Sequence, residues 1–159
     1  MITLYHGSNV GIDNIDLNRC HPDKDFGKGY YLTDIRSQAE AMAIRRTRIA
    51  GEGSPILTTY TFDETLLHST ELKVKIFDTP NEEWALFILA NREASLTGYK
   101  HDYDIVIGPI ADDGVAFQLD RYTRGIIDLP TLVKELSFRK LNRQYYFGTE
   151  RAIQTLKKQ

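Results

Sequence analysis

The length, composition and charge of the chain exclude several classes of protein. With 159 residues, 42% of them hydrophobic, the chain can bury one sizeable core, and we expect a single domain spanning residues 1–159. The 20 Lys and Arg against 22 Asp and Glu give a net charge of -2, which provides no overall attraction to nucleic acid or to an anionic membrane. The single cysteine excludes an internal disulfide, and the sequence contains neither a signal-peptide pattern nor a membrane-spanning apolar run. We therefore expect a soluble cytoplasmic protein.

The first half of the chain predicts four strands and one helix. Ser37 and Glu40 form a capping-box pattern, which predicts a helix over residues 39–50 that ends at Gly51 and Gly53. Runs of β-branched and aromatic residues bounded by turn residues predict the strands. These strands cover residues 2–8, 29–32, 55–62 and 72–77.

The second half predicts four more helices and two strands. Thr79 as N-cap, Pro80 in the first turn and Glu82 predict a helix over residues 82–92. The remaining helices are expected at 114–122, at 129–138 after Asp128, and at 150–158 after Thr149, and the strands at 105–110 and 143–149. Because strands and helices do not alternate regularly, the pattern favours an α+β fold over a doubly wound parallel sheet.

Histidine and cysteine show no pattern that is typical of a metal site or of cysteine catalysis. His6, His68 and His101 lie far apart in the sequence, without the short spacing that metal ligands usually show. Cys20 and His21 are adjacent on a turn-rich segment, where the two side chains rarely face each other. We therefore expect neither a metal nor a catalytic thiol.

Two motifs resemble those of a known fold family. "LYHGS" and "GKGYYLTD" resemble the first two motifs of the ADP-ribosyltransferase fold, in its diphtheria-toxin and poly(ADP-ribose) polymerase branch. In that branch a histidine, a glycine and a serine or threonine end one strand, a Gly-Lys-Gly turn and a tyrosine open the next, and a glutamate lies on a late strand. The best match to the late motif is "NRQYYF" (142–147), in which Gln144 stands where the family has the glutamate.

A second resemblance covers nearly the whole chain. The stretches "YHGS", "DFGKGYY", "NR" and "GPIADD", together with the segment from Gln144 onward, resemble an uncharacterised bacterial family thought to share this fold. The two resemblances imply a split β-sheet core with flanking helices, and a mono-ADP-ribosyltransferase that uses NAD+ as its substrate. They also imply a macromolecular acceptor, protein or nucleic acid, and a toxin-like role controlled by a neighbouring antitoxin.

The resemblance also implies roles for individual residues. His6, Tyr31 and Gln144 would be catalytic, and NAD+ would be bound by His6, Gly7, Ser8, Gly29 and Tyr31. Gly7 would hold the nicotinamide amide through its main chain, His6 would bond a ribose hydroxyl, and Tyr31 would stack on the nicotinamide ring. Gln144 keeps a hydrogen bond to the ribose but lacks the negative charge of a glutamate. Because neighbouring strand residues point to opposite faces, Tyr30 and Tyr31 cannot both line the pocket.

Several polar residues leave two interpretations open. Asp112 and Asp113 would supply acid–base chemistry or bind a target, or they would simply make a turn. Arg92 would contact a ligand diphosphate or carboxylate, or would favour the helix dipole. Arg45, Arg46 and Arg48 form the one local basic cluster, which would contact nucleic acid or form a solvated helix face. The rival to the enzyme is a non-catalytic NAD+ or ADP-ribose binding module that has lost the glutamate.

Overall fold

Two β-sheets form the centre of the protein. The computed structural model describes residues 1–159. The first sheet has the antiparallel order β1–β3–β7, and the second has the order β2–β6–β5–β4, in which only β4 and β5 are parallel. The strands are β1 (Ile2–Ser8), β2 (Tyr30–Leu32), β3 (Ile56–Phe62), β4 (Val74–Ile76), β5 (Ile105–Pro109), β6 (Arg143–Phe147) and β7 (Lys157–Lys158). The predicted α+β class is confirmed.

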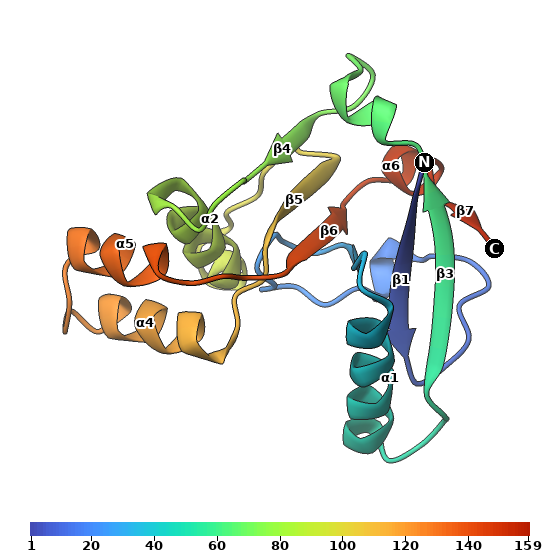
Figure 1. The fold of residues 1–159 in the computed structure, drawn as a ribbon, viewed down its shortest axis with the longest axis horizontal. Helices are drawn as coiled ribbons and strands as arrows, with labels where there is room; N and C mark the ends of the chain where they lie inside the picture. Colours follow the sequence, from blue (N-terminus) through green and yellow to red (C-terminus); the bar gives the residue numbers. More distant parts are fainter.

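Six α-helices and two short 3₁₀ helices surround the sheets. They are α1 (Arg36–Ala50), α2 (Glu82–Arg92), α3 (Ala94–Thr97), α4 (Asp113–Thr123), α5 (Leu129–Ser137), α6 (Glu150–Ile153), η1 (Leu17–Arg19) and η2 (Glu64–His68). Figure 1 shows α1 beside β1 and β3, while α4 and α5 lie next to each other at the opposite end of the molecule.

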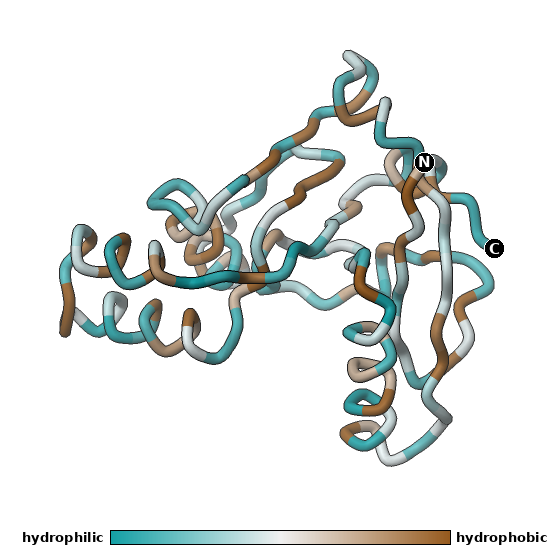
Figure 2. The backbone as a smooth tube through the Cα atoms, viewed as in Figure 1, coloured by the Kyte–Doolittle hydropathy of each residue, from teal (hydrophilic) through white to brown (hydrophobic).

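The second sheet is buried on both of its faces. One face packs with Leu4 and Phe62 of the first sheet in a cluster that includes Ile105 and Ile107. The opposite face, which includes Val106, packs against α2, α4 and α5. All five residues of β5 are buried, and Figure 2 shows the hydrophobic run along this strand. Burial on both faces explains why β5 has a continuous apolar sequence in place of alternation.

Two predicted helix N-caps are wrong. α1 begins at Arg36, before the predicted capping-box serine, and its N-cap Ile35 offers no side-chain bond. The Thr33 hydroxyl instead accepts a hydrogen bond from Ile35 N at 3.1 Å, because the chain enters the helix directly after β2. α2 is capped by Asn81, whose Oδ1 accepts from Trp84 N at 2.9 Å, and not by Thr79. The asparagine cap leaves Pro80 outside the helix.

The predicted C-terminal helix is also shorter than expected. The Thr149 cap is confirmed, since its hydroxyl accepts a hydrogen bond from Ala152 N, but α6 ends at Ile153. The chain then turns, and Lys157 and Lys158 pair with Thr61 and Tyr60 on the free edge of β3. Pairing with an available sheet edge thus outweighs the helical tendency of the last residues.

Candidate functional site

A pocket lies where the two sheets separate. An isolated bridge joins Tyr5 of β1 to Thr33, with N···O distances of 2.8 and 3.0 Å. Continuing the same register would pair Gly7 with Tyr31, but no such ladder forms and the strands diverge. The bridge therefore closes one end of a gap whose two sides carry the first and second predicted motifs.

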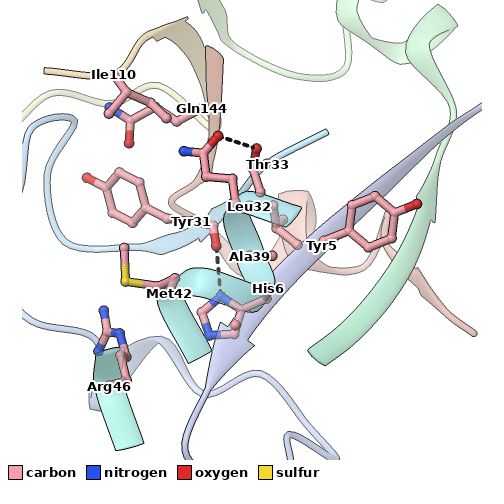
Figure 3. Close-up of a pocket in the computed structure, with 12 residues that line it drawn as sticks. Tyr5, His6, Tyr31, Leu32, Thr33, Ala39, Met42, Arg46, Ile110 and Gln144 are labelled. Carbon is pink, nitrogen blue, oxygen red and sulfur yellow. Dashed lines mark hydrogen bonds between the residues drawn. The ribbon is translucent and has the colours of Figure 1, made fainter. Parts of the chain in front are cut away.

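The pocket has a volume of about 150 Å³. It is bounded by β1, β2, the first three turns of α1 and the two segments that carry Ile110 and Gln144 (Figure 3). Its lining residues are Tyr5, His6, Gly7, Tyr31, Leu32, Thr33, Gln38, Ala39, Met42, Arg46, Ile110 and Gln144. Sites for whole drug-sized ligands span roughly 300–1,000 Å³. This pocket therefore fits one ring of a larger ligand better than a complete dinucleotide.

His6 is held in one orientation and one protonation state. Its Nδ1 lies 2.8 Å from the carbonyl oxygen of Tyr31, to which it donates a proton, and its ring stacks on Tyr30 at 4.3 Å. Burial lowers the pKa of His6, the bond to the Tyr31 carbonyl opposes this, and the nearby Arg46 cation lowers the pKa further. The imidazole is therefore neutral at pH 7, and its Nε2 can accept a hydrogen bond from a ligand hydroxyl.

Tyr31 forms one wall of the pocket and anchors the glycine turn. Its hydroxyl donates to Gly27 O at 2.7 Å and accepts from Phe26 N at 3.0 Å. Its ring meets the Tyr146 ring edge-on at 5.3 Å. Burial raises the pKa of Tyr31 far above its usual value, so the hydroxyl remains a donor. The expected division of the tyrosine pair is confirmed, because Tyr30 packs on the opposite face, in the cluster between the sheets.

Gly7 has a steric reason to be glycine that the sequence did not indicate. A Cβ at this position would lie 1.9 Å from Ala39 O, because the backbone of α1 packs directly on β1. The N–H and C=O of Tyr5 point to Thr33, so those of Gly7, two residues later, point to the same edge of β1 and into the gap. Both groups can bond an amide in the pocket.

Gln144 carries the one buried side-chain polar atom that lacks a hydrogen-bond partner. This atom is Nε2, and the residue lines the pocket from β6, on the same face of the sheet as Tyr146. A buried donor without a partner costs about 1–3 kcal/mol. A ligand oxygen in the pocket would satisfy Nε2.

Comparison with known proteins gives one family. A family model described as "Protein of unknown function (DUF3990)" matches residues 2–158. The chain belongs to this family. No curated protein and no solved structure matches it.

Four of the predicted site residues of this DUF3990 member meet at one pocket, and five do not. His6, Gly7, Tyr31 and Gln144 all line it. The Ser8 hydroxyl bonds Val10 O at 2.5 Å, and Gly29 packs under the Tyr146 ring. Arg92, Asp112 and Asp113 lie outside the lining as well.

The contacts of the last three residues favour the structural interpretations of the sequence. Arg92 Nε bonds Asp25 Oδ1 at 2.7 Å, so its charge is already paired. Asp112 caps α4 by accepting a hydrogen bond from Val115 N at 2.8 Å, and Asp113 lies in the first turn of the same helix. None of the three residues lines the pocket, so a role for them in binding a ligand or an acceptor stays a prediction.

Three pocket residues of α1 were not expected there from the sequence: Gln38, Ala39 and Arg46. Met42 and Arg46 follow Ala39 along one face of α1 and reach the pocket beside Tyr31 and His6 (Figure 3). Their spacing of four residues, which puts two side chains on one helix face, was the available signal for Arg46. The helix itself gives little indication of a buried face, because only Ala39 and Ala43 are buried.

A second and larger groove of about 1100 Å³ lies beyond the wall formed by Tyr31 and Tyr146. Segments 17–28 and 98–104 and the start of α6 border this groove. Two of its cations are paired, Lys73 with Asp102 and Arg151 with Asp104. The structure has no group of three or more His, Cys, Asp or Glu side chains placed to hold a metal. None of its helices combines the length and apolar character needed to cross a bilayer.

Proposed function

We propose that the protein is a mono-ADP-ribosyltransferase that cleaves NAD+ and transfers ADP-ribose to a macromolecule. The observation that carries the proposal is the convergence of His6, Gly7, Tyr31 and Gln144, from three separate strands, on one small pocket. They are four of the six residues to which the resemblance to ADP-ribosyltransferases assigns a role in catalysis or NAD+ binding; Ser8 and Gly29 do not line the pocket. The split between the sheets, bridged only at Tyr5 and Thr33, fits the core that the resemblance implies.

Each group in the pocket has a task in binding the nicotinamide riboside part of NAD+. The ring stacks on Tyr31, an aromatic contact worth about 0.5–1.5 kcal/mol beyond the buried area. The carboxamide bonds the N–H and C=O of Gly7. The ribose hydroxyls donate to His6 Nε2 and accept from Gln144 Nε2, the atom that lacks a partner in the free protein.

The reaction breaks the bond between the nicotinamide nitrogen and C1′ of the ribose. Nicotinamide leaves as a neutral molecule with the bonding electron pair, and C1′ passes through an oxocarbenium-like state, as in glycoside hydrolysis. The acceptor nucleophile then forms its bond to C1′ and loses a proton. Holding both sugar and ring in a fixed geometry lowers the entropic part of the barrier.

The experiment follows labelled NAD+ and free nicotinamide during incubation of the purified protein with a cell extract. The wild type is expected to transfer label, and Tyr31→Ala and Gln144→Ala to lose the transfer. Gln144→Glu places the missing charge beside C1′ and is expected to raise nicotinamide release about 10²-fold, the usual value of one preorganised electrostatic group. His21→Gln, an exposed position outside the pocket, serves as the matched control. Absence of transfer and of nicotinamide release in the wild type would contradict the proposal.

The rival is a non-catalytic NAD+ or ADP-ribose binding module. It is favoured by the absence of any carboxylate among the residues that line the pocket, where the resemblance implies a glutamate. The same assay separates the two, because the module binds NAD+ without releasing nicotinamide. Growth arrest on expression of the wild type, but not of Tyr31→Ala, would support the enzyme and its expected toxin-like role.

A further inference from the structure

Arg46 is the one charged residue that lines the pocket between the sheets. It lies on α1 four residues after Met42, and Figure 3 shows its guanidinium beside Met42 and near His6. The side chain is exposed, so the cation stands at the mouth of the pocket and not in its interior.

The positive charge of Arg46 is not neutralised within the protein. Arg46 forms no ion pair, whereas Arg36 and Arg92 each pair with a carboxylate. The helix positions three and four residues away hold Met42, Ala43, Ile49 and Ala50, and none of these can supply a counter-ion. Arg46 is also close enough to His6 for its charge to contribute to the lowered pKa of that imidazole.

The size of the pocket implies that part of any dinucleotide must lie outside it. The volume of about 150 Å³ accommodates a single ring, so the groups beyond the first sugar emerge at the mouth. In NAD+ those groups are the two phosphates. A planar guanidinium forms two parallel hydrogen bonds with phosphate oxygens, whereas the ammonium group of a lysine acts as a point charge. An arginine is therefore well suited to bind a phosphate group.

We propose that Arg46 forms a phosphate-binding subsite at the mouth of the pocket and selects ligands that carry a phosphate beyond the ring and sugar. This inference rests on the proposed function for the identity of the ring, but not for the anion. It gives α1 a second role in addition to packing on β1. It also separates Arg46 from its neighbours Arg45 and Arg48, which do not line the pocket.

The test compares three ligands on three proteins by titration calorimetry. NAD+, nicotinamide mononucleotide and nicotinamide riboside differ in having two, one and no phosphates. Arg46→Gln should weaken NAD+ and the mononucleotide at least 10-fold, since a charge-assisted hydrogen bond is worth about 1.5–3 kcal/mol, and should leave the riboside unchanged. The matched control is Arg45→Gln. Arg45 is the neighbouring residue on α1, is also exposed and forms no ion pair, so this substitution should change none of the three affinities.

Each remaining outcome decides between the subsite and the proposed function. Equal NAD+ affinity of the wild type and Arg46→Gln overturns the subsite but keeps the function. Equal loss in Arg45→Gln overturns the subsite in favour of a diffuse basic surface. Binding of inorganic pyrophosphate that depends on Arg46, without binding of any nicotinamide ligand, supports the subsite and rejects the function. Binding of none of these probes rejects both.

Discussion

The unpaired Nε2 of Gln144 destabilises the free protein but can donate a hydrogen bond to a ligand. Its Nε2 is buried beside an open pocket without a partner. We predict that Gln144→Leu, which is of similar size, leaves the free energy of unfolding unchanged or raises it by about 1 kcal/mol, because the unpaired donor disappears. NAD+ binding should be lost in the same variant. Urea unfolding and calorimetry measure the two effects.

A second glutamine provides the control for this prediction. Gln118 is buried, and its Oε1 accepts a hydrogen bond from Arg121 at 3.1 Å, whereas Gln144 Nε2 is buried without a partner. Gln118→Leu should therefore lower the free energy of unfolding, by about 1.5–3 kcal/mol for a bond to a charged donor, discounted for the exposure of the arginine. A destabilisation of Gln144→Leu equal to that of Gln118→Leu would show that Nε2 has a partner in solution.

His6 gives the protein a pH dependence whose sign follows from its burial. Burial lowers the pKa of His6 below 6.5, the value expected in the unfolded chain, so the unfolded state takes up the proton first as the pH falls. The stabilisation is complete above pH 6.5 and declines below it. We predict that, between about pH 6.5 and pH 5, the free energy of unfolding changes less steeply with pH in His6→Gln than in the wild type. The difference in slope should be up to about 1.4 kcal/mol per pH unit.

The remaining slope in that variant is expected to come from His101, whose pKa burial also lowers. His101 Nε2 donates to Phe26 O at 2.6 Å while its Nδ1 accepts from Tyr103 N at 3.1 Å, which requires the neutral ring. A slope in His6→Gln identical to the wild type would mean that the pKa of His6 is the same in the folded and unfolded protein, as for a freely hydrated imidazole.

The contact between α1 and β1 is the packing that shapes the pocket. We predict that Gly7→Ala lowers the free energy of unfolding by about 3 kcal/mol or more, because the added Cβ would lie 1.9 Å from Ala39 O and the helix backbone must move away. Gly11→Ala is the control, since nothing lies within 4 Å of a Cβ there. Denaturant unfolding of both variants is the measurement, and equal stability would show that α1 is not packed on Gly7 in solution.

Sequence patterns located the elements better than they located their ends. The caps at Asp128 and Thr149 were predictable because a single side chain close in sequence satisfies the first turn. The start of α1 was not, since it depends on the bridge from Tyr5 to Thr33, which brings together residues from two strands. The same limit applies to β7, whose pairing with β3 spans nearly a hundred residues.

At the scale of the whole molecule, the family resemblance predicted which distant residues meet at the pocket, which local sequence patterns could not predict. Strand parity separated Tyr30 from Tyr31, but only the resemblance associated Tyr31 with His6 and with Gln144, which lies more than a hundred residues later. Arg46 was expected from the sequence only as part of a basic cluster, because an exposed arginine on a helix is usually solvated and nothing in the sequence indicates that it borders the pocket. The charged candidates Arg92, Asp112 and Asp113 were equally ambiguous in sequence. In the structure Arg92 pairs with Asp25, Asp112 caps α4 and Asp113 lies in the first turn of that helix.

Asp104 ties together segments that the sequence keeps far apart. It is fully buried at the start of β5, where it accepts hydrogen bonds from Lys73 N, from the Thr149 hydroxyl and from Arg151. Burial alone would raise the pKa of Asp104, but the bonds from Arg151, Thr149 and Lys73 together lower it. The stabilisation from the ionised group is therefore present above about pH 4 and is lost as the pH falls through the lower folded pKa.

We predict that Asp104→Asn lowers the free energy of unfolding at pH 7 by about 2 kcal/mol or more, because the amide cannot accept all of these bonds and leaves buried donors unpaired. The loss should appear as one cooperative transition, since the residue joins β4, β5 and the α6 segment that leads to β7 in the other sheet. Asp102→Asn, which removes only an exposed pair with Lys73, should change the midpoint little. Two separate transitions, or equal effects of the two variants, would show that Asp104 stabilises its own turn and does not couple the sheets.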